Sequence, residues 1–110
     1  MARQTVETKL AKDILHWLDE LIEQGKPVYY EHRSGSGGFN YRRGVPDLFL
    51  VIDGLHVEVE LKAPDGKLSA DQEKFQWKCQ RRGTPYLCPR TLEQFQAFIK
   101  KILDCKPTST

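Results

Sequence analysis

A predicted β-hairpin in the middle of the chain constrains the fold more than any other sequence feature. The dipeptide Asp53-Gly54 readily adopts the positive φ angles of a two-residue hairpin turn, and β-forming residues flank it on both sides. Residues 48–52 before the turn are entirely apolar. Residues 55–62 after it alternate, with one face made of Leu55, Val57, Val59 and Leu61. Such a hairpin needs other elements to cover its apolar surface.

Helical and strand patterns surround this hairpin. Residues 6–24 have the apolar spacing of an amphipathic helix, with Thr5 as a predicted N-cap and Gly25 as a stop signal. Residues 28–33 read as a strand that follows Pro27. A glycine- and serine-rich segment, predicted to be a loop, then leads to the hairpin.

The second half of the chain contains two more predicted helices, and each begins with a capping box. Ser69 and Gln72 open a helix that extends to residue 82 and ends before Gly83. Residues 85–88 are a short strand, and Thr91 with Gln94 opens the last helix. The order is therefore αβββαβα, which predicts an α/β fold with a mixed sheet flanked by helices.

Length and composition predict one domain of residues 1–105, followed by a polar tail of residues 106–110. No apolar run approaches the ~20 residues of a membrane-spanning helix, and no signal-peptide pattern is seen, so we expect no membrane partner. The three cysteines form no C-x-x-C pair, which favours reduced thiols and a cytoplasmic location. The net charge of +2 permits a nucleic-acid partner without requiring one.

Three side chains are predicted to meet on one face of the hairpin. Glu60 and Lys62 are two residues apart on one strand, and Asp47 precedes the other strand. Two carboxylates and a lysine suit a hard divalent cation with water and phosphate as its other ligands. The lysine can position the attacking water and offset phosphate charge. The alternative is a solvated strand face with no chemistry, which a lone Glu-x-Lys would favour.

Glu7 lies on the inward face of the predicted first helix, in line with Ala11, Ile14 and Leu18. An inward carboxylate needs a partner. The helix N-terminus could be that partner, because acidic groups are favoured there. The same metal ion is the other possibility, and the sequence leaves the two open.

These motifs resemble the VRR-Nuc domain, a branch of the PD-(D/E)xK nuclease superfamily. The resemblance covers about residues 6–89. It rests on Gly44-Val45-Pro46-Asp47, Glu60-Leu61-Lys62, Leu68-Ser69, Gln72 and Gly83. It implies a restriction-endonuclease-like core and hydrolysis of phosphodiester bonds with Mg²⁺ or Mn²⁺ as cofactor and no other small-molecule cofactor. The extra acid Glu58 beside Glu60 departs from a clean motif, although only Glu60 has a lysine two residues later.

The resemblance also implies roles for individual residues. The implied metal ligands are Asp47, Glu60, the carbonyl of Leu61, and Glu7. The implied catalytic residues are Asp47, Glu60, Lys62 and Gln72. Stand-alone members of the family, largely from phages and bacteria, resemble homodimers that cut branched DNA such as Holliday junctions. We therefore expect a homodimeric, structure-selective endonuclease. A flap or splayed-arm nuclease and a non-catalytic DNA-binding module are the alternatives.

Basic residues near the glycine-rich segment predict a track for DNA phosphates. Residues 33–43 contain three arginines, two aromatic residues and no acid. The small residues there suit close approach of a phosphate backbone. The predicted DNA contacts are Arg33, Ser36, Arg42, Arg43, Lys67 and Lys74. The basic residues of the helix at 70–82 also fit an ordinary solvated face.

Overall fold

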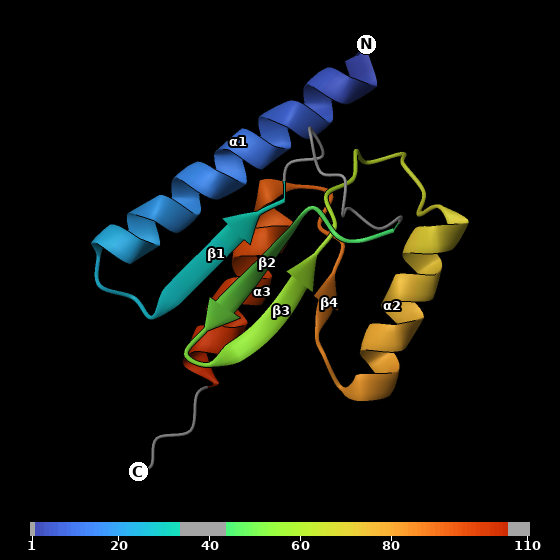
Figure 1. The fold of residues 1–110 in the computed structure, drawn as a ribbon. Coiled ribbons are helices and arrows are strands. Elements are labelled where there is room, and N and C mark those ends of the chain that lie inside the picture. The colour runs from blue at the N-terminus through green and yellow to red at the C-terminus, as the bar shows by residue number, and fades with distance from the viewer. Residues whose placement is uncertain (1, 34–43, 106–110) are drawn as a thin grey trace.

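The computed structural model describes residues 2–33 and 44–105, and it describes side chains from Val6 onward. The order of its elements is the predicted αβββαβα (Figure 1). The elements are α1 (Ala2–Glu23), β1 (Val28–His32), β2 (Leu48–Ile52), β3 (Leu55–Val59), α2 (Ala70–Arg82), β4 (Tyr86–Leu87) and α3 (Leu92–Asp104).

The four strands form one mixed sheet in the order β1-β2-β3-β4. β1, β2 and β3 are antiparallel neighbours, and β4 runs parallel to β3. The hairpin turn is formed as predicted, with φ angles of 50° at Asp53 and 88° at Gly54. This two-residue turn pairs Leu48 with Val59 at the far end of the hairpin. The predicted mixed sheet with flanking helices is confirmed.

One face of the sheet carries the hydrophobic core, which α1 and α3 cover. β2 alternates strictly, so Leu48, Leu50 and Ile52 are buried on this face. Ile14 and Leu18 from α1 and Phe95 and Ile99 from α3 are fully buried against them. The ring of Trp17 meets Phe95 edge-on at 5.9 Å between centroids, which joins the two helices directly.

α2 packs against the opposite face, beside β3 and β4 (Figure 1). As a result, both faces of β3 are covered near its end. Glu58 and Glu60 are buried together with their apolar neighbours Val57 and Val59. The solvated strand face that the sequence left open is therefore wrong, and these carboxylates need partners inside the protein.

Several boundaries differ from the sequence predictions. α1 begins at Ala2, so Thr5 lies inside the helix and is not its N-cap. β1 ends at His32 and β3 ends at Val59, because both residues pair with Leu48, the first residue of β2. β4 has two residues, Tyr86 and Leu87. The predicted tail at residues 106–110 lies outside the described residues.

The helix caps also differ in detail. Ser69 and Gln72 form the predicted capping box reciprocally, and Gly83 closes α2 with a φ of 76°. Thr91 caps α3 by accepting from the Gln94 N–H at 3.1 Å. The Gln94 side chain, however, accepts from the backbone N–H of Arg90 at 2.8 Å rather than from Thr91. Within the described residues, no helix is long and apolar enough to span a bilayer.

Candidate metal and catalytic site

The hairpin register brings Asp47 and Glu60 together. Leu48 pairs with Val59, so Asp47 and Glu60 lie opposite each other one position beyond the ladder. Directly opposed residues of antiparallel strands project to the same face. Here that face is the one covered by α2, away from the core leucines. The predicted meeting of the two carboxylates therefore follows from a turn of two residues.

Asp47 is held firmly by its backbone neighbours. Its Oδ2 accepts a hydrogen bond from the Leu61 N–H at 2.8 Å, across the open end of the hairpin. Its carbonyl accepts from the Arg33 N–H at 2.7 Å, which continues the pairing with β1. These two bonds fix the side chain and the backbone of Asp47 in one orientation.

The glycine that precedes Asp47 in the motif has a steric role. Gly44 has a φ of 82°, in the left-handed region. A Cβ atom at this position would lie 2.4 Å from the backbone carbonyl oxygen of Asp71, in the first turn of α2. Only glycine therefore lets the segment that carries Asp47 pass this close to α2.

Glu60 is the most strongly perturbed acid of the site. Its side chain is nearly inaccessible, with 3% of the residue exposed. Its Oε2 accepts from the Gln72 Nε2 at 3.0 Å, whereas its Oε1 has no hydrogen-bond partner among residues 2–33 and 44–105. Burial, followed by the negative charge of Asp47, raises the pKa of Glu60 to about 8, although Lys62 partly opposes this effect. A carboxylate in this position requires either a proton or a cation.

Gln72 links the start of α2 to this acid. Its Oε1 accepts from the Ser69 N–H at 2.8 Å to close the capping box, and its Nε2 donates to Glu60. The side-chain amide of Gln72 therefore accepts from a backbone N–H at the start of α2 and also orients the buried carboxylate of Glu60. The structure thus places Gln72 beside Glu60, and its predicted catalytic role stays a prediction.

Glu7 reaches the same region from α1. Because α1 begins at Ala2, Glu7 is beyond the first turn, and the helix N-terminus is not its partner. Its Oε2 accepts from the Ala63 N–H at 3.2 Å, and its charge contributes to raising the pKa of Glu60. Glu7 thus borders the pair of carboxylates.

The loop after β3 is fixed by an arginine that sequence reasoning missed. The Arg90 Nη1 donates to the carbonyls of both Ala63 and Gly66, the first at 2.9 Å. Gly66 lies close to the Lys62 side chain, since a Cβ there would be 3.3 Å from the Lys62 Cδ. Arg90 therefore shapes the loop against which Lys62 packs. Its isolated position after Pro89 offers no sequence signal for this role.

The neighbouring acid Glu58 has a different environment. Arg33 donates to both of its oxygens, at 2.8 and 3.1 Å, and His56 lies 2.7 Å from its Oε2. Burial opposes ionisation of Glu58, but the bonds from Arg33 and His56 outweigh it, so the pKa of Glu58 is lowered. The two acids are therefore distinct: Glu58 is already paired, whereas one oxygen of Glu60 has no hydrogen bond to the described part of the chain.

The predicted DNA contacts fall into three groups. Ser36, Arg42 and Arg43 lie outside the described residues. Lys67 and Lys74 are exposed, in the loop after β3 and on α2. Arg33 also donates to the Pro46 carbonyl at 2.9 Å, and its guanidinium lies 5.0 Å from the Phe49 ring centroid. A phosphate contact by Arg33 would have to compete with these internal bonds.

A second buried group beside Glu60 lacks a partner. Tyr86 on β4 pairs in register with Glu58, and its hydroxyl has no hydrogen bond among the described residues. Burial raises the pKa of Tyr86 above its ordinary value, and the charge of Glu60 adds to this effect. The predicted short strand at 85–88 was the only sequence signal near it.

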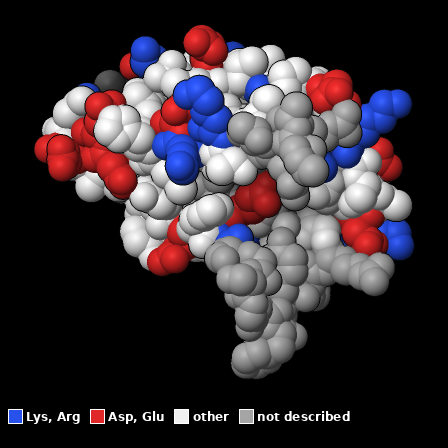
Figure 2. All heavy atoms as spheres, turned by 90° about the horizontal axis from the view of Figure 1, so that it is seen from above, with Lys and Arg blue, Asp and Glu red and all other residues white. Residues whose placement is uncertain are grey.

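The donors present fit a hard divalent cation. Among residues 2–33 and 44–105, no three His, Cys, Asp or Glu side chains are arranged to hold a metal. Mg²⁺ commonly uses only one or two protein carboxylates with waters, and carboxylates also suit Mn²⁺. Asp47 and the unpartnered Glu60 Oε1 supply such a pair. Figure 2 looks down on this end of the sheet and shows acidic surface recessed in the middle, with lysine and arginine side chains nearby.

Comparison with known proteins supports the fold. No protein family and no curated protein sequence matches this chain. A solved structure described as a VRR_NUC domain is similar, with a TM-score of 0.67 and 21% sequence identity. The similarity covers 86% of this chain and 95% of that one. The chain therefore has the fold of a VRR_NUC domain, the restriction-endonuclease-like core that its motifs predict.

Proposed function

We propose that this protein is a metal-dependent, structure-selective DNA endonuclease that hydrolyses phosphodiester bonds. The observation that supports this most is the pairing of Asp47 with Glu60 at the open end of the hairpin. Glu60 is buried there with one unpartnered oxygen, and a basic residue, Lys62, follows two positions later. The solved chain of the same fold is described as a VRR_NUC domain, a name that denotes nucleases.

In this proposal, Asp47, Glu60 and the Leu61 carbonyl would hold Mg²⁺ or Mn²⁺, with Glu7 at the border. The ion would supply charge stabilisation and an activated water. The Leu61 N–H holds the Asp47 carboxylate in place, and Gln72 orients Glu60. Lys62 positions the attacking water and offsets the charge that develops on the phosphate. The hydrogen bonds from Arg90 to the carbonyls of Ala63 and Gly66 support the loop beside Lys62.

The proposed substrate is a four-way DNA junction cut by a homodimer. A two-fold dimer presents two such sites to two strands, which suits the symmetry of a junction. The proposed phosphate contacts are Ser36, Arg42, Arg43, Lys67 and Lys74. Arg33 is a weaker candidate because of its bonds to Glu58.

The test is cleavage of an end-labelled four-way junction in Mg²⁺, in Mn²⁺ and in EDTA, with a linear duplex of the same sequence alongside. We expect paired, metal-dependent nicks in the junction, and their loss in Asp47→Asn and Lys62→Ala. Asp104→Asn, an exposed acid at the end of α3, is the matched control and should cut normally. Cutting of flaps or splayed arms alone would change the proposed substrate.

Binding of junctions without cleavage in any metal would replace the nuclease by a DNA-binding module on the same fold. Calorimetric titration with Mn²⁺ separates these cases further. Glu60→Gln should bind Mn²⁺ at least tenfold more weakly than the parent protein, and an equal affinity would remove Glu60 from the proposed ligands.

A further inference from the structure

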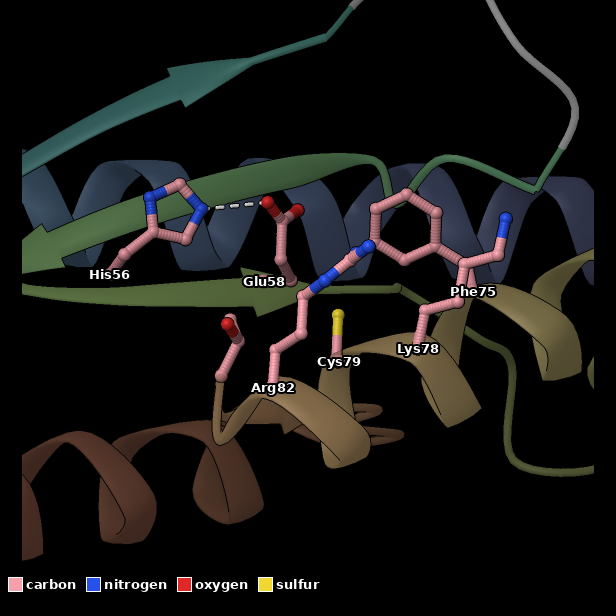
Figure 3. A pocket seen from close by; sticks show the side chains of 7 residues that line it. His56, Glu58, Phe75, Lys78, Cys79 and Arg82 are labelled. Carbon is pink, nitrogen blue, oxygen red and sulfur yellow. Dashed lines mark hydrogen bonds and ion pairs between the residues drawn. The ribbon is translucent and has the colours of Figure 1, made fainter.

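A cavity lies beside the candidate site, between β3 and α2, with a volume of about 440 Å³. This volume is within the range of small-molecule sites. In Figure 3 the side chains of Phe75, Lys78 and Arg82 extend from α2 toward β3, where His56 and Glu58 lie. The cavity therefore combines an aromatic ring with two cationic side chains.

The charge of this cavity favours an anion. Its single acid, Glu58, is paired with Arg33 and with His56. Within the described part of the chain, neither Lys78 nor Arg82 makes an ion pair with an acidic side chain. Two cationic groups are thus available at the cavity, while its carboxylate is already neutralised.

Neighbouring residues on the same two elements place the cavity beside the candidate site. Glu58 on β3 and Glu60, one residue beyond its end, project to the same side, about 7 Å apart along the extended chain. Gln72, which contacts Glu60, and Phe75, which lines the cavity, are three residues apart on α2 and share a helix face. A strand whose phosphate lies at Asp47 and Glu60 would reach the cavity within about one nucleotide.

We propose that this cavity binds one nucleotide of the DNA strand beside the cleavage position. The phosphate would lie on Lys78 and Arg82, and the base would stack on Phe75, as bases do on aromatic platforms in single-strand sites. The identification of the strand rests on the proposed nuclease function. Nucleotide binding itself requires neither metal nor cleavage, so it can be tested separately.

The test is a titration with thymidine 5′-monophosphate in EDTA, followed by backbone amide NMR. Thymidine and inorganic phosphate serve as partial probes. We expect shifts at His56, Phe75 and Thr84, with tighter binding of the nucleotide than of either fragment. Equal binding of inorganic phosphate, or shifts elsewhere on the surface, would overturn the nucleotide site.

Two adjacent arginines give a matched pair of variants. Arg82→Gln and Lys78→Gln remove the charge but retain a polar side chain, and each should weaken nucleotide binding at least fivefold. Arg81→Gln is the control, because the Arg81 guanidinium lies 5.0 Å from the Trp77 ring centroid and Arg81 does not line the cavity. Its affinity should stay within twofold of the parent value. Equal losses in Arg81→Gln and Arg82→Gln would mean general surface charge and would refute the site.

Phe75→Leu tests the aromatic contribution and retains an apolar side chain at the α2 packing face. It should remove the preference for nucleotide over phosphate, and an unchanged preference would overturn stacking on Phe75. Asp47→Asn should bind the nucleotide like the parent protein. If the parent protein binds the nucleotide in the cavity but cuts no DNA, the proposed nuclease is refuted and the nucleotide site stands. Cleavage without nucleotide binding in the cavity would refute the nucleotide site and leave the proposed nuclease standing.

Discussion

Replacing Arg33 by methionine tests whether this residue belongs to the protein interior or to the DNA track. Methionine replaces the aliphatic part of the arginine side chain and can still pack on Phe49, but it cannot donate to Glu58. In the parent protein the Glu58 side chain is 8% exposed, and Arg33 donates to both of its oxygens. The variant therefore leaves a buried acid with His56 as its remaining partner.

The expected cost follows from these contacts. Removing one partner of a buried ion pair costs about 3–5 kcal/mol. The Arg33 side chain is 25% exposed and His56 stays bonded to Glu58, so the cost should be lower, at about 2–3 kcal/mol. Because the pKa of Glu58 is lowered in the folded state, the pair contributes stability above the unfolded pKa of 4.5. That contribution disappears as the pH falls through the folded pKa.

The assay is urea denaturation at pH 7 and at pH 3, applied to a double-mutant cycle of Arg33→Met and Glu58→Gln. The combined variant should be more stable than the sum of the single losses predicts, by at least 1 kcal/mol at pH 7. Arg33→Met should also lose less stability than the parent between pH 5 and pH 3. A loss of unfolding free energy below about 0.5 kcal/mol in Arg33→Met, or strict additivity of the two substitutions, would refute the ion pair. It would favour the alternative in which Arg33 binds DNA phosphates.

Three further predictions concern the site. In the metal-free protein, the raised pKa of Glu60 makes its contribution to the free energy of unfolding complete below pH 4.5, and this contribution is lost as the pH rises to about 8. Glu60→Gln should abolish this loss in urea titrations, and a loss that persists would exclude Glu60 as its source. Gly44→Ala combines a left-handed φ with a backbone clash and should cost about 2–4 kcal/mol, seen as a lower melting temperature; an unchanged Tm would contradict the close approach to α2. Ser69→Ala should cost about 1 kcal/mol through the helix cap, whereas Gln72→Ala should also slow cleavage at least tenfold; equal cleavage rates would limit Gln72 to capping.

Local chemistry made much of the fold predictable. The Asp53-Gly54 turn determines the register of β2 and β3, and this register brings Asp47 opposite Glu60. Ser69 with Gln72 marks the start of α2 because the capping box is formed by residues three positions apart. These features depend on short stretches of sequence, so local sequence patterns predict them.

The remaining features depend on contacts between distant residues. Arg33 follows β1 and bonds to Glu58 on β3, across the intervening strand β2, a pairing that no local pattern indicates. From sequence, its charge beside a glycine-rich segment indicated phosphate binding. The start of α1 at Ala2 was missed because the early polar residues weaken the amphipathic pattern there. Of the two partners that the sequence left open for Glu7, the helix end is therefore excluded; its Oε2 accepts from the Ala63 amide, and the metal ion stays a prediction.

The bonds from Arg90 to the loop after β3 have a consequence for folding. The hairpin can bring the two carboxylates together by local pairing alone, but the loop beside Lys62 is fixed only after residues beyond β4 have docked. We therefore expect the loop beside Lys62 to open whenever the C-terminal part of the chain undocks. In hydrogen exchange, the amide of Gly66, which donates to the Ala63 carbonyl, should report the same opening free energy as the amides of α3.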